Sequence, residues 1–178
     1  MRKVAIAFGF KGVLCEKILE AQKILKNHLN IKYMSIDHSV PHITLISGKS
    51  KNTNLLYNAL KKNNFKKFKI KSPGLGIFAN NKPNLYLRWE SGINKKKISK
   101  SIIKKVSPLF SLIDHNSKDE LWVAKTTIAW NDLKYSHFEE LYKKIQFMFS
   151  THSTVVKSIY VIDYTIKETI THTINLDN

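Results

Sequence analysis

Two short segments of the sequence each place a basic side chain two residues before a threonine. The first is PHITL at 41–45, and the second is AKTTI at 124–128. Successive side chains of a β-strand point to opposite faces of the sheet. If both segments are strands, His42 shares one face with Thr44, and Lys125 shares one face with Thr127.

Two basic groups beside two hydroxyls suit the chemistry of a phosphodiester. Threonine hydroxyls donate hydrogen bonds to the non-bridging phosphate oxygens, while imidazole and ammonium groups carry protons or offset negative charge. If an approximate two-fold axis relates the two halves of the chain, the two pairs face each other across one cleft. The candidate catalytic residues are therefore His42, Thr44, Lys125 and Thr127.

The rest of the sequence predicts alternating strands and helices around these segments. We expect strands at 3–10, 39–47 and 120–130, two or three strands within 65–92, and two closing strands joined by a hairpin at 167–168. The apolar periodicity predicts helices at 12–29, 53–63, 94–106 and 136–149. This order indicates an α+β fold with an approximate internal duplication. No linker separates the halves, so we expect a single domain over 1–178 made of two intertwined lobes.

The charge balance of the chain is strongly basic. The 178 residues include 30 Lys and Arg against 13 Asp and Glu, a formal net charge of +17. Such a charge attracts phosphates, but the same lysines also suit a solvated surface that keeps a protein soluble; the composition leaves both interpretations open. Arg2 and Arg88 are the only arginines, which argues against specificity for duplex DNA, because arginine makes the bidentate base contacts.

Other features of the sequence exclude several classes of protein. The apolar runs are far shorter than the ~20 residues that span a bilayer, and the N-terminal run lacks a signal-peptide cleavage site. The single cysteine, Cys15, allows neither an internal disulfide nor a cysteine-based zinc site. No helix start follows the glycines of GLGIFANN at 74–81, as a dinucleotide fingerprint requires. We expect a cytoplasmic monomer without a metal or another cofactor.

Three segments, in this order, resemble the 2H phosphoesterase superfamily. They are VPHITL (40–45), GLGIFANNKPNLYLRW (74–89) and LWVAKTTIAW (121–130). This superfamily includes 2′-5′ RNA ligase-like and cyclic phosphodiesterase enzymes and is named for two His-x-Thr/Ser motifs. The resemblance spans nearly the whole chain and implies two βαββ-type lobes with antiparallel sheets around a central cleft. It also implies a metal-independent phosphodiesterase, with one histidine as base and one as acid, for nucleotide or RNA substrates. Such substrates carry a 2′,3′-cyclic phosphate or a 2′-5′ linkage, or are cyclic dinucleotides.

The second motif departs from the pattern of this superfamily. His42 and Thr44 match the first motif, and Thr127 matches the hydroxyl of the second. Lys125 stands where the second histidine belongs, and Ala124 where a proline is usual. A lysine ammonium titrates near ~10.4, against ~6.5 for imidazole, so Lys125 serves as an acid only if its surroundings lower its pKa. Three interpretations stay open: an enzyme with a lysine acid, a slow enzyme, and a non-catalytic module that binds RNA or a nucleotide. We favour an enzyme in which Lys125 offsets phosphoryl charge.

Further residues are candidates for substrate binding. The strand that carries Arg88 flanks the cleft in the resembling family, so Arg88 is expected to contact a phosphate. Tyr86 and Trp130 offer rings on which a base stacks, although core roles compete with this use of aromatic side chains.

Histidines outside the motif have competing interpretations. Strand alternation puts His172 on the face of Ile170 and Ile174. There it is either a hydrogen-bonded structural histidine, which we favour, or a replacement acid that points into the cleft. His38 precedes the first motif by four residues and is expected at the rim of the cleft.

Overall fold

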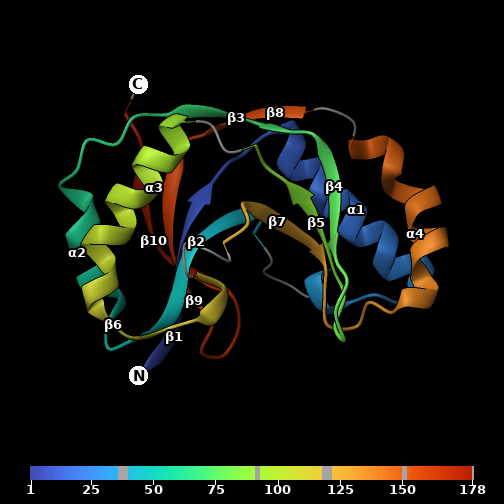
Figure 1. Cartoon of the computed structure of the whole chain (residues 1–178), viewed down its shortest axis with the longest axis horizontal. Helices are drawn as coiled ribbons and strands as arrows, with labels where there is room; N and C mark the ends of the chain where they lie inside the picture. Colours follow the sequence, from blue (N-terminus) through green and yellow to red (C-terminus); the bar gives the residue numbers. More distant parts are fainter. Residues whose placement is uncertain (36–39, 91–92, 118–121, 150–151, 178) are drawn as a thin grey trace.

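Two antiparallel sheets lie side by side, with their helices on the outer sides (Figure 1). The computed structural model describes residues 1–35, 40–90, 93–117, 122–149 and 152–177. His38 and the first residues of the strand expected at 120–130 lie outside the described residues.

The larger sheet has five strands. In spatial order they are β10 (Thr169–Asn175), β9 (Ser158–Asp163), β1 (Arg2–Gly9), β2 (His42–Ser50) and β6 (Phe110–Ile113). Every neighbouring pair is antiparallel. Two helices, α2 (Thr53–Lys61) and α3 (Ile93–Val106), cover one face of this sheet. The strand β6 was not predicted from the sequence.

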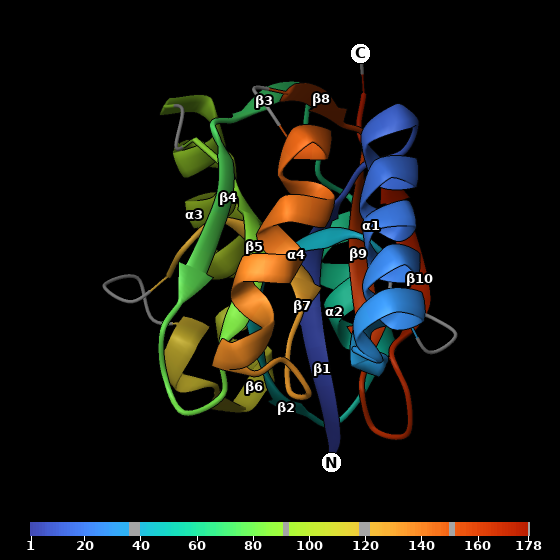
Figure 2. The same cartoon turned by 90° about the vertical axis from the view of Figure 1, so that its right-hand side faces the viewer.

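The smaller sheet has three strands in the order β4 (Gly74–Phe78), β5 (Asn84–Arg88) and β7 (Lys125–Ala129). The helices α1 (Val13–Leu29) and α4 (Phe138–Ile145) pack together over it, as the turned view shows (Figure 2). A short 3-10 turn, Gln146–Phe149, replaces the last part of the helix expected at 136–149. A two-stranded ribbon of β3 (Phe68–Ser72) and β8 (His152–Val156) runs along one end of the molecule.

The two lobes are interleaved along the chain and do not correspond to its two halves. The larger sheet combines β1 and β2 from the N-terminal part with β9 and β10 from the C-terminal part. Helix α1 follows β1 directly, yet it packs against β7 of the other sheet. The α+β fold with two antiparallel lobes is confirmed. The order of helices and strands repeats approximately in the two halves, but the lobes do not coincide with these halves.

A single hydrophobic core continues from one sheet to the other. Phe8 of β1 packs edge-to-face on Phe68 of β3, with ring centroids 5.0 Å apart. Phe10 packs in the same way on Trp89, which follows β5, at 5.4 Å. Edge-to-face pairs contribute about 0.5–1.5 kcal/mol beyond the area they bury. These contacts fix the position of one sheet relative to the other, and thereby that of the two motif strands.

Among the described helices, none combines the length and the apolar character that a membrane crossing requires.

Candidate active site

The first motif lies on β2 with the alternation that the sequence predicted. His42 and Thr44 are half-buried, while Ile43 and Leu45 are buried in the core. Across the ladder, His42 lies opposite Gly9 and Thr44 lies opposite Ala7. The two motif side chains therefore lie on the face of the larger sheet that α2 and α3 do not cover.

The second motif repeats this arrangement on β7. Lys125 and Thr127 are half-buried, and the residues between and after them, Thr126 and Ile128, are buried. The register pairs Lys125 with Arg88 and Thr127 with Tyr86. Since directly opposed residues of a ladder share a face, the basic and hydroxyl groups of the motif lie beside Arg88 and Tyr86.

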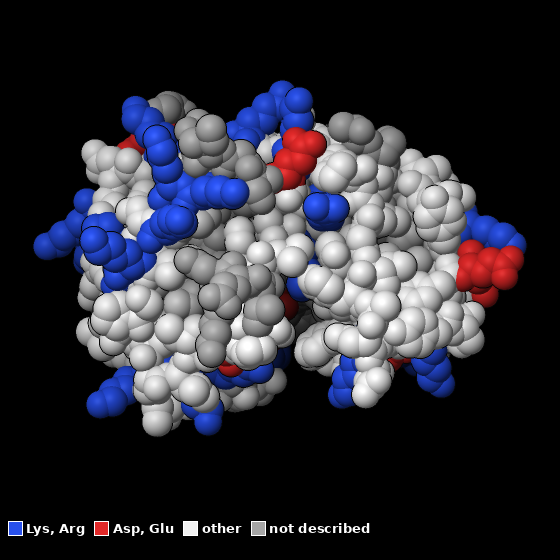
Figure 3. Space-filling view, in the orientation of Figure 1, with Lys and Arg blue, Asp and Glu red and all other residues white. Residues whose placement is uncertain are grey.

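The two motif strands are neighbours where the sheets meet, β2 from one lobe and β7 from the other (Figure 1). The indole Nε1 of Trp122, just before β7, donates a hydrogen bond of 2.8 Å to the carbonyl oxygen of Thr44. This bond ties the approach to the second motif to the strand of the first. The molecular surface is hollowed between the two lobes, with basic and acidic atoms in its depth (Figure 3).

The imidazole of His42 is held by two acceptors on one side. Its Nδ1 lies 2.7 Å from the carbonyl oxygen of Val40 and 3.3 Å from Oε1 of Glu168. The same carboxylate oxygen accepts a hydrogen bond of 3.2 Å from the Val40 N–H. With two acceptors beside it, Nδ1 carries the ring proton, and the lone pair is left on Nε2.

The other ring nitrogen of His42 meets the hydroxyl of Tyr164. The distance from Tyr164 Oη to His42 Nε2 is 3.0 Å, and the Thr44 hydroxyl also bonds to this phenol. Burial, reinforced by the charge of Glu168, raises the pKa of Tyr164 far above its ordinary value. Tyr164 therefore stays a neutral phenol that donates to Nε2.

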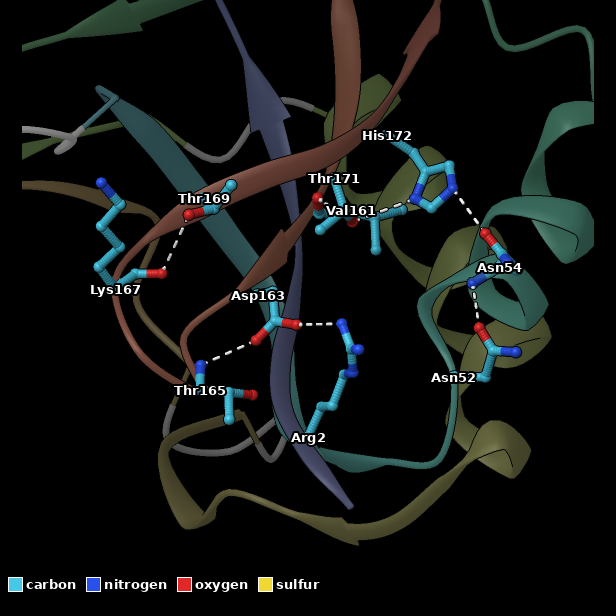
Figure 4. A network of polar contacts seen from close by, with 10 residues as sticks. All are labelled: Arg2, Asn52, Asn54, Val161, Asp163, Thr165, Lys167, Thr169, Thr171 and His172. Atoms are coloured by element: carbon cyan, nitrogen blue, oxygen red, sulfur yellow. Dashed lines mark hydrogen bonds and ion pairs between the residues drawn. The ribbon is translucent and has the colours of Figure 1, made fainter.

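Backbone contacts around Tyr164 fix its place. The Tyr164 N–H donates to the carbonyl oxygen of Lys3 at 2.8 Å. The preceding Asp163 accepts hydrogen bonds from the Thr165 N–H at 2.8 Å and from Arg2 at 3.0 Å (Figure 4). The end of β9 is thus anchored to β1, so that Tyr164 reaches the motif of β2.

Lys125 has a different environment from that of a surface lysine. Its Nζ donates a hydrogen bond of 3.0 Å to Oγ1 of Thr127 and lies 6.0 Å from the centre of the Phe78 ring. Burial lowers the pKa of Lys125 from 10.5 to about 8. The side chain is therefore mostly protonated at neutral pH, yet it gives up its proton far more readily than an ordinary lysine. Burial thus moves the pKa of Lys125 in the direction that a proton-donating role requires.

Aromatic side chains pack on the smaller sheet beside the second motif. The Tyr86 ring lies over Gly76 so closely that a Cβ on this glycine would come 2.5 Å from the ring. Phe78 packs on Tyr86 with ring centroids 4.6 Å apart. Tyr86 is 7% exposed, so it lines the site mainly through its packing.

Two further predicted residues lie at the surface near the motifs. Arg88 is exposed beside Lys125. Trp130, just after β7, is 38% exposed and packs edge-to-face on Tyr33, with ring centroids 5.4 Å apart. The Tyr33 phenol is near enough to Tyr164 to act on it electrostatically, so this aromatic pair belongs to the surroundings of the first motif.

His172 does not join the motif residues. Its Nε2 lies 2.9 Å from Oδ1 of Asn54 on α2 (Figure 4). Its ring stacks on Tyr57, with ring centroids 4.8 Å apart. A β-bulge between Ile170 and His172 shifts the register. Ile170 therefore packs in the small cluster with Ala7 and Tyr160, while His172 turns to the helix-covered face. The expectation that His172 shares the face of Ile170 is wrong because of this bulge.

Two residues of the site, Tyr164 and Glu168, were missed by the sequence analysis. The predicted hairpin at 167–168 marks their part of the chain, and β9 and β10 do form that hairpin. No periodicity signals that β9 pairs with β1, which in turn pairs with β2. This long-range pairing is what brings Tyr164 and Glu168 to His42.

The described part of the chain contains no group of three or more His, Cys, Asp or Glu side chains that could hold a metal ion.

No protein-family model and no curated protein matches the sequence. Solved structures are nevertheless similar over the whole chain. One is TT0787 of Thermus thermophilus, with 13% identity, a TM-score of 0.64 and coverage of 98% of this chain and 97% of that chain. Another is E. coli LigT complexed with 3′-AMP, with 9% identity, a TM-score of 0.61 and coverage of 99% of both chains. A third is a phosphoesterase with 10% identity, a TM-score of 0.60 and coverage of 99% of both chains.

These similarities cover nearly the whole chain, and therefore both lobes. At this level of identity they concern the arrangement of the backbone. The fold that the resemblance of VPHITL and LWVAKTTIAW implied is therefore confirmed. The protein has the bilobal fold of the 2H phosphoesterases.

Proposed function

We propose that the protein is a metal-independent phosphodiesterase of the 2H type. Its substrate is a nucleotide or RNA with a 2′,3′-cyclic phosphate or a 2′-5′ linkage, or it is a cyclic dinucleotide. One observation carries this proposal: the half-buried Lys125, whose pKa is lowered to about 8, donates a hydrogen bond to Thr127, on the strand next to the one that carries His42 and Thr44. We also propose that the enzyme is cytoplasmic and monomeric.

In this mechanism His42 and Lys125 carry the protons. The lowered pKa of Lys125 favours this role over the charge-offsetting role that we expected from the sequence. The nucleophile, water or a ribose hydroxyl, attacks phosphorus as His42 takes its proton at Nε2. The bond from phosphorus to the leaving oxygen breaks, and Lys125 gives its proton to that oxygen. Proton transfers of this kind contribute typically about 10²–10⁴-fold each. Glu168, 3.3 Å from Nδ1, stabilises the imidazolium that forms.

The threonines and Tyr164 complete the proposed roles. Thr44 and Thr127 donate hydrogen bonds to the phosphoryl oxygens. Since the Tyr164 hydroxyl occupies Nε2, it either passes the proton on from the nucleophile or turns toward the phosphate when substrate binds. The complex of LigT with 3′-AMP supports a nucleotide as the ligand of this fold.

A second candidate is a non-catalytic module that binds a nucleotide or RNA in the same hollow. The observation that favours it is the engagement of both ring nitrogens of His42, together with a lysine in place of the second motif histidine. A binding site needs the positive charge and the hydroxyls but no free base.

The test is incubation with a panel of 2′,3′-cyclic nucleotides, 2′-5′ oligoadenylates and cyclic dinucleotides, followed by product analysis. On the substrate that is cleaved, His42→Ala is expected to lower the rate by about 10²–10⁴-fold. His172→Ala is the matched control, because it removes a histidine of the same sheet that contacts Asn54 instead of the site. It is expected to keep the wild-type rate.

The outcomes separate the two candidates. Turnover that depends on His42 and not on His172 supports the enzyme. Binding of the panel compounds without any product, in the wild type as well, supports the binding module. Turnover that survives His42→Ala within a few-fold would show that His42 is not the proton carrier.

A further inference from the structure

Helix α3 carries an unusual concentration of one charge. Its fourteen residues, INKKKISKSIIKKV, include six lysines and no acidic residue. Lys96, Lys97, Lys100 and Lys104 are exposed, and at 100° per residue they fall on one side of the helix. Three of them recur every four residues, about 6 Å apart along the helix axis. These four residues form the α3 lysine face.

The charges of the α3 lysine face are not offset by neighbours. None of its lysines forms an ion pair with a carboxylate of the described residues. On α4, by contrast, Lys143 and Lys144 each pair with a glutamate one turn earlier. The space-filling view shows a cluster of basic side chains on the left-hand lobe, over the position of α3 (Figure 3).

The opposite side of α3 holds the helix firmly in place. Ile102 and Val106 are completely buried, and Ile98 and Ile103 pack partly buried against the same core. The helix contacts α2, β2 and β3. The backbone that carries the four lysines is therefore held in place by packing against the larger lobe.

The chain leads directly from the candidate active site to α3. Arg88, opposite Lys125, ends β5, and α3 begins at Ile93. Between them, the Glu90 N–H donates 2.9 Å to the carbonyl oxygen of Lys71. Along the chain, Arg88 is the last basic residue before α3, and Glu90 lies between them.

We propose that the α3 lysine face binds the phosphate backbone of single-stranded RNA whose reacting phosphodiester lies at the two motifs. This inference rests on the proposed function and narrows its substrate to an oligonucleotide. A row of uncompensated lysines neutralises successive phosphates without reading bases. Helix α3 exposes no large apolar side chain among its described residues, unlike the helices that insert into lipid.

The test measures equilibrium binding of a fluorescein-labelled single-stranded RNA of about 12 nucleotides over a series of salt concentrations. The variant carries Lys96→Gln, Lys100→Gln and Lys104→Gln. Each lost phosphate contact lowers the salt slope by ~0.7 for a single strand. The slope of log K against log salt is therefore expected to become shallower by about 2.

A matched control removes the same charge elsewhere. Lys17→Gln, Lys23→Gln and Lys26→Gln all lie on α1, the helix that also carries Glu16 and Glu20. This variant has the same net charge as the first and is expected to keep the wild-type slope. Equal losses in the two variants would overturn the proposal, because binding would then follow net charge alone.

Binding is measured without turnover, so an inactive protein still gives an answer. If no substrate of the panel is cleaved but the RNA binds through α3, the proposed function fails and the binding surface stands. If phosphodiester turnover is found but the α3 variant binds RNA like the wild type, the surface is wrong and the function stands. Stronger α3-dependent binding to vesicles of anionic phospholipid or to a polyglutamate peptide than to the RNA also overturns the proposal.

Discussion

The charge of Lys125, which the proposed chemistry uses, lowers the stability of the folded protein. A group whose pKa falls on folding, from 10.5 to about 8, binds its proton more weakly in the folded state than in the unfolded chain. Folding is therefore penalised below pH 8, where both states are protonated, and the penalty disappears as the pH rises from about 8 to 10.5. A half-buried cation that costs stability is expected to persist where its charge is used.

The first prediction concerns Lys125→Met, which keeps the length of the side chain and removes the charge. At pH 7 it is expected to raise the free energy of unfolding by up to about 3 kcal/mol, since one pKa unit corresponds to ~1.4 kcal/mol. The advantage should shrink between pH 8 and 10.5, as the wild type loses its buried charge. Urea unfolding at several pH values measures it. Lys143→Met, at an exposed residue paired with Glu139, is the control; the same pH dependence in both variants would contradict the prediction.

The second prediction concerns Glu168, which acts through His42 and is a positioning residue. Glu168→Gln keeps a hydrogen-bonding group beside Nδ1 but removes the charge that stabilises the imidazolium. Hydrogen bonds to charged groups contribute about 1.5–3 kcal/mol, so kcat is expected to fall about 10- to 150-fold while KM changes little. Steady-state kinetics measure both constants, and the imidazole ¹⁵N shifts report the tautomer. Glu139→Gln, on the exposed part of α4, is the control.

A wild-type kcat in Glu168→Gln, with the Nδ1–H tautomer retained, would show that the carboxylate does not assist His42.

The sequence predicted the motif side chains, because a period of two is enough to place His42 with Thr44. It did not predict Glu168 or Tyr164, because their proximity to His42 depends on pairing between strands more than a hundred residues apart.

At the scale of elements, periodicity predicted the position of the elements better than their faces and ends. The four helices and the closing hairpin are present close to their expected places. The bulge at Thr171, where the hydroxyl bonds to the Val161 carbonyl at 3.1 Å, reverses the side on which His172 lies. One inserted residue reverses every side chain beyond it, and nothing in the local pattern of polar and apolar residues marks the insertion.

Glycines in the strands of both lobes leave room for a tyrosine ring. A Cβ on Gly9 of β1 would come 2.2 Å from the Tyr160 ring of β9, and Gly76 has the same relation to Tyr86. Each sheet thus has a tyrosine ring packed closely against a strand glycine. Gly9 also lies opposite His42, so this packing supports the first motif.

The third prediction is that Gly9→Ala destabilises the protein by about 1–3 kcal/mol, the usual cost of an extra methyl group in a packed interior. The loss should be largely absent when Tyr160→Leu removes the ring. Urea unfolding of the four proteins of this double-mutant cycle gives the coupling, expected at about 0.5–3 kcal/mol. An equal loss in both backgrounds would mean that the ring does not need the glycine.

At the scale of the whole molecule, the candidate site depends on the interleaving of the lobes. Neither half of the chain contains a complete sheet, since the C-terminal strand β9 pairs with β1, and α1 crosses to the smaller sheet. The α+β class followed from the order of the elements, because it needs only their types. Which strands pair could not be predicted, because exchanging strands between lobes leaves local propensity and periodicity unchanged.

The last prediction tests whether the two lobes form one site. A ligand that binds only the folded protein stabilises it by about 2.7 kcal/mol at a hundred times its Kd. We expect 3′-AMP, a ligand of the similar LigT, to raise the melting temperature of the wild type. Thr44→Val and Thr127→Val each remove one hydroxyl from the phosphate, and a hydrogen bond to a charged group contributes about 1.5–3 kcal/mol. Each variant should therefore lose most of the shift, although the two threonines belong to different sheets. Thr169→Val, at an exposed threonine that bonds to the Lys167 carbonyl, should keep the full shift. If one motif variant keeps the full shift, the nucleotide is held by one lobe alone, and the chemistry proposed for the paired motifs loses its basis.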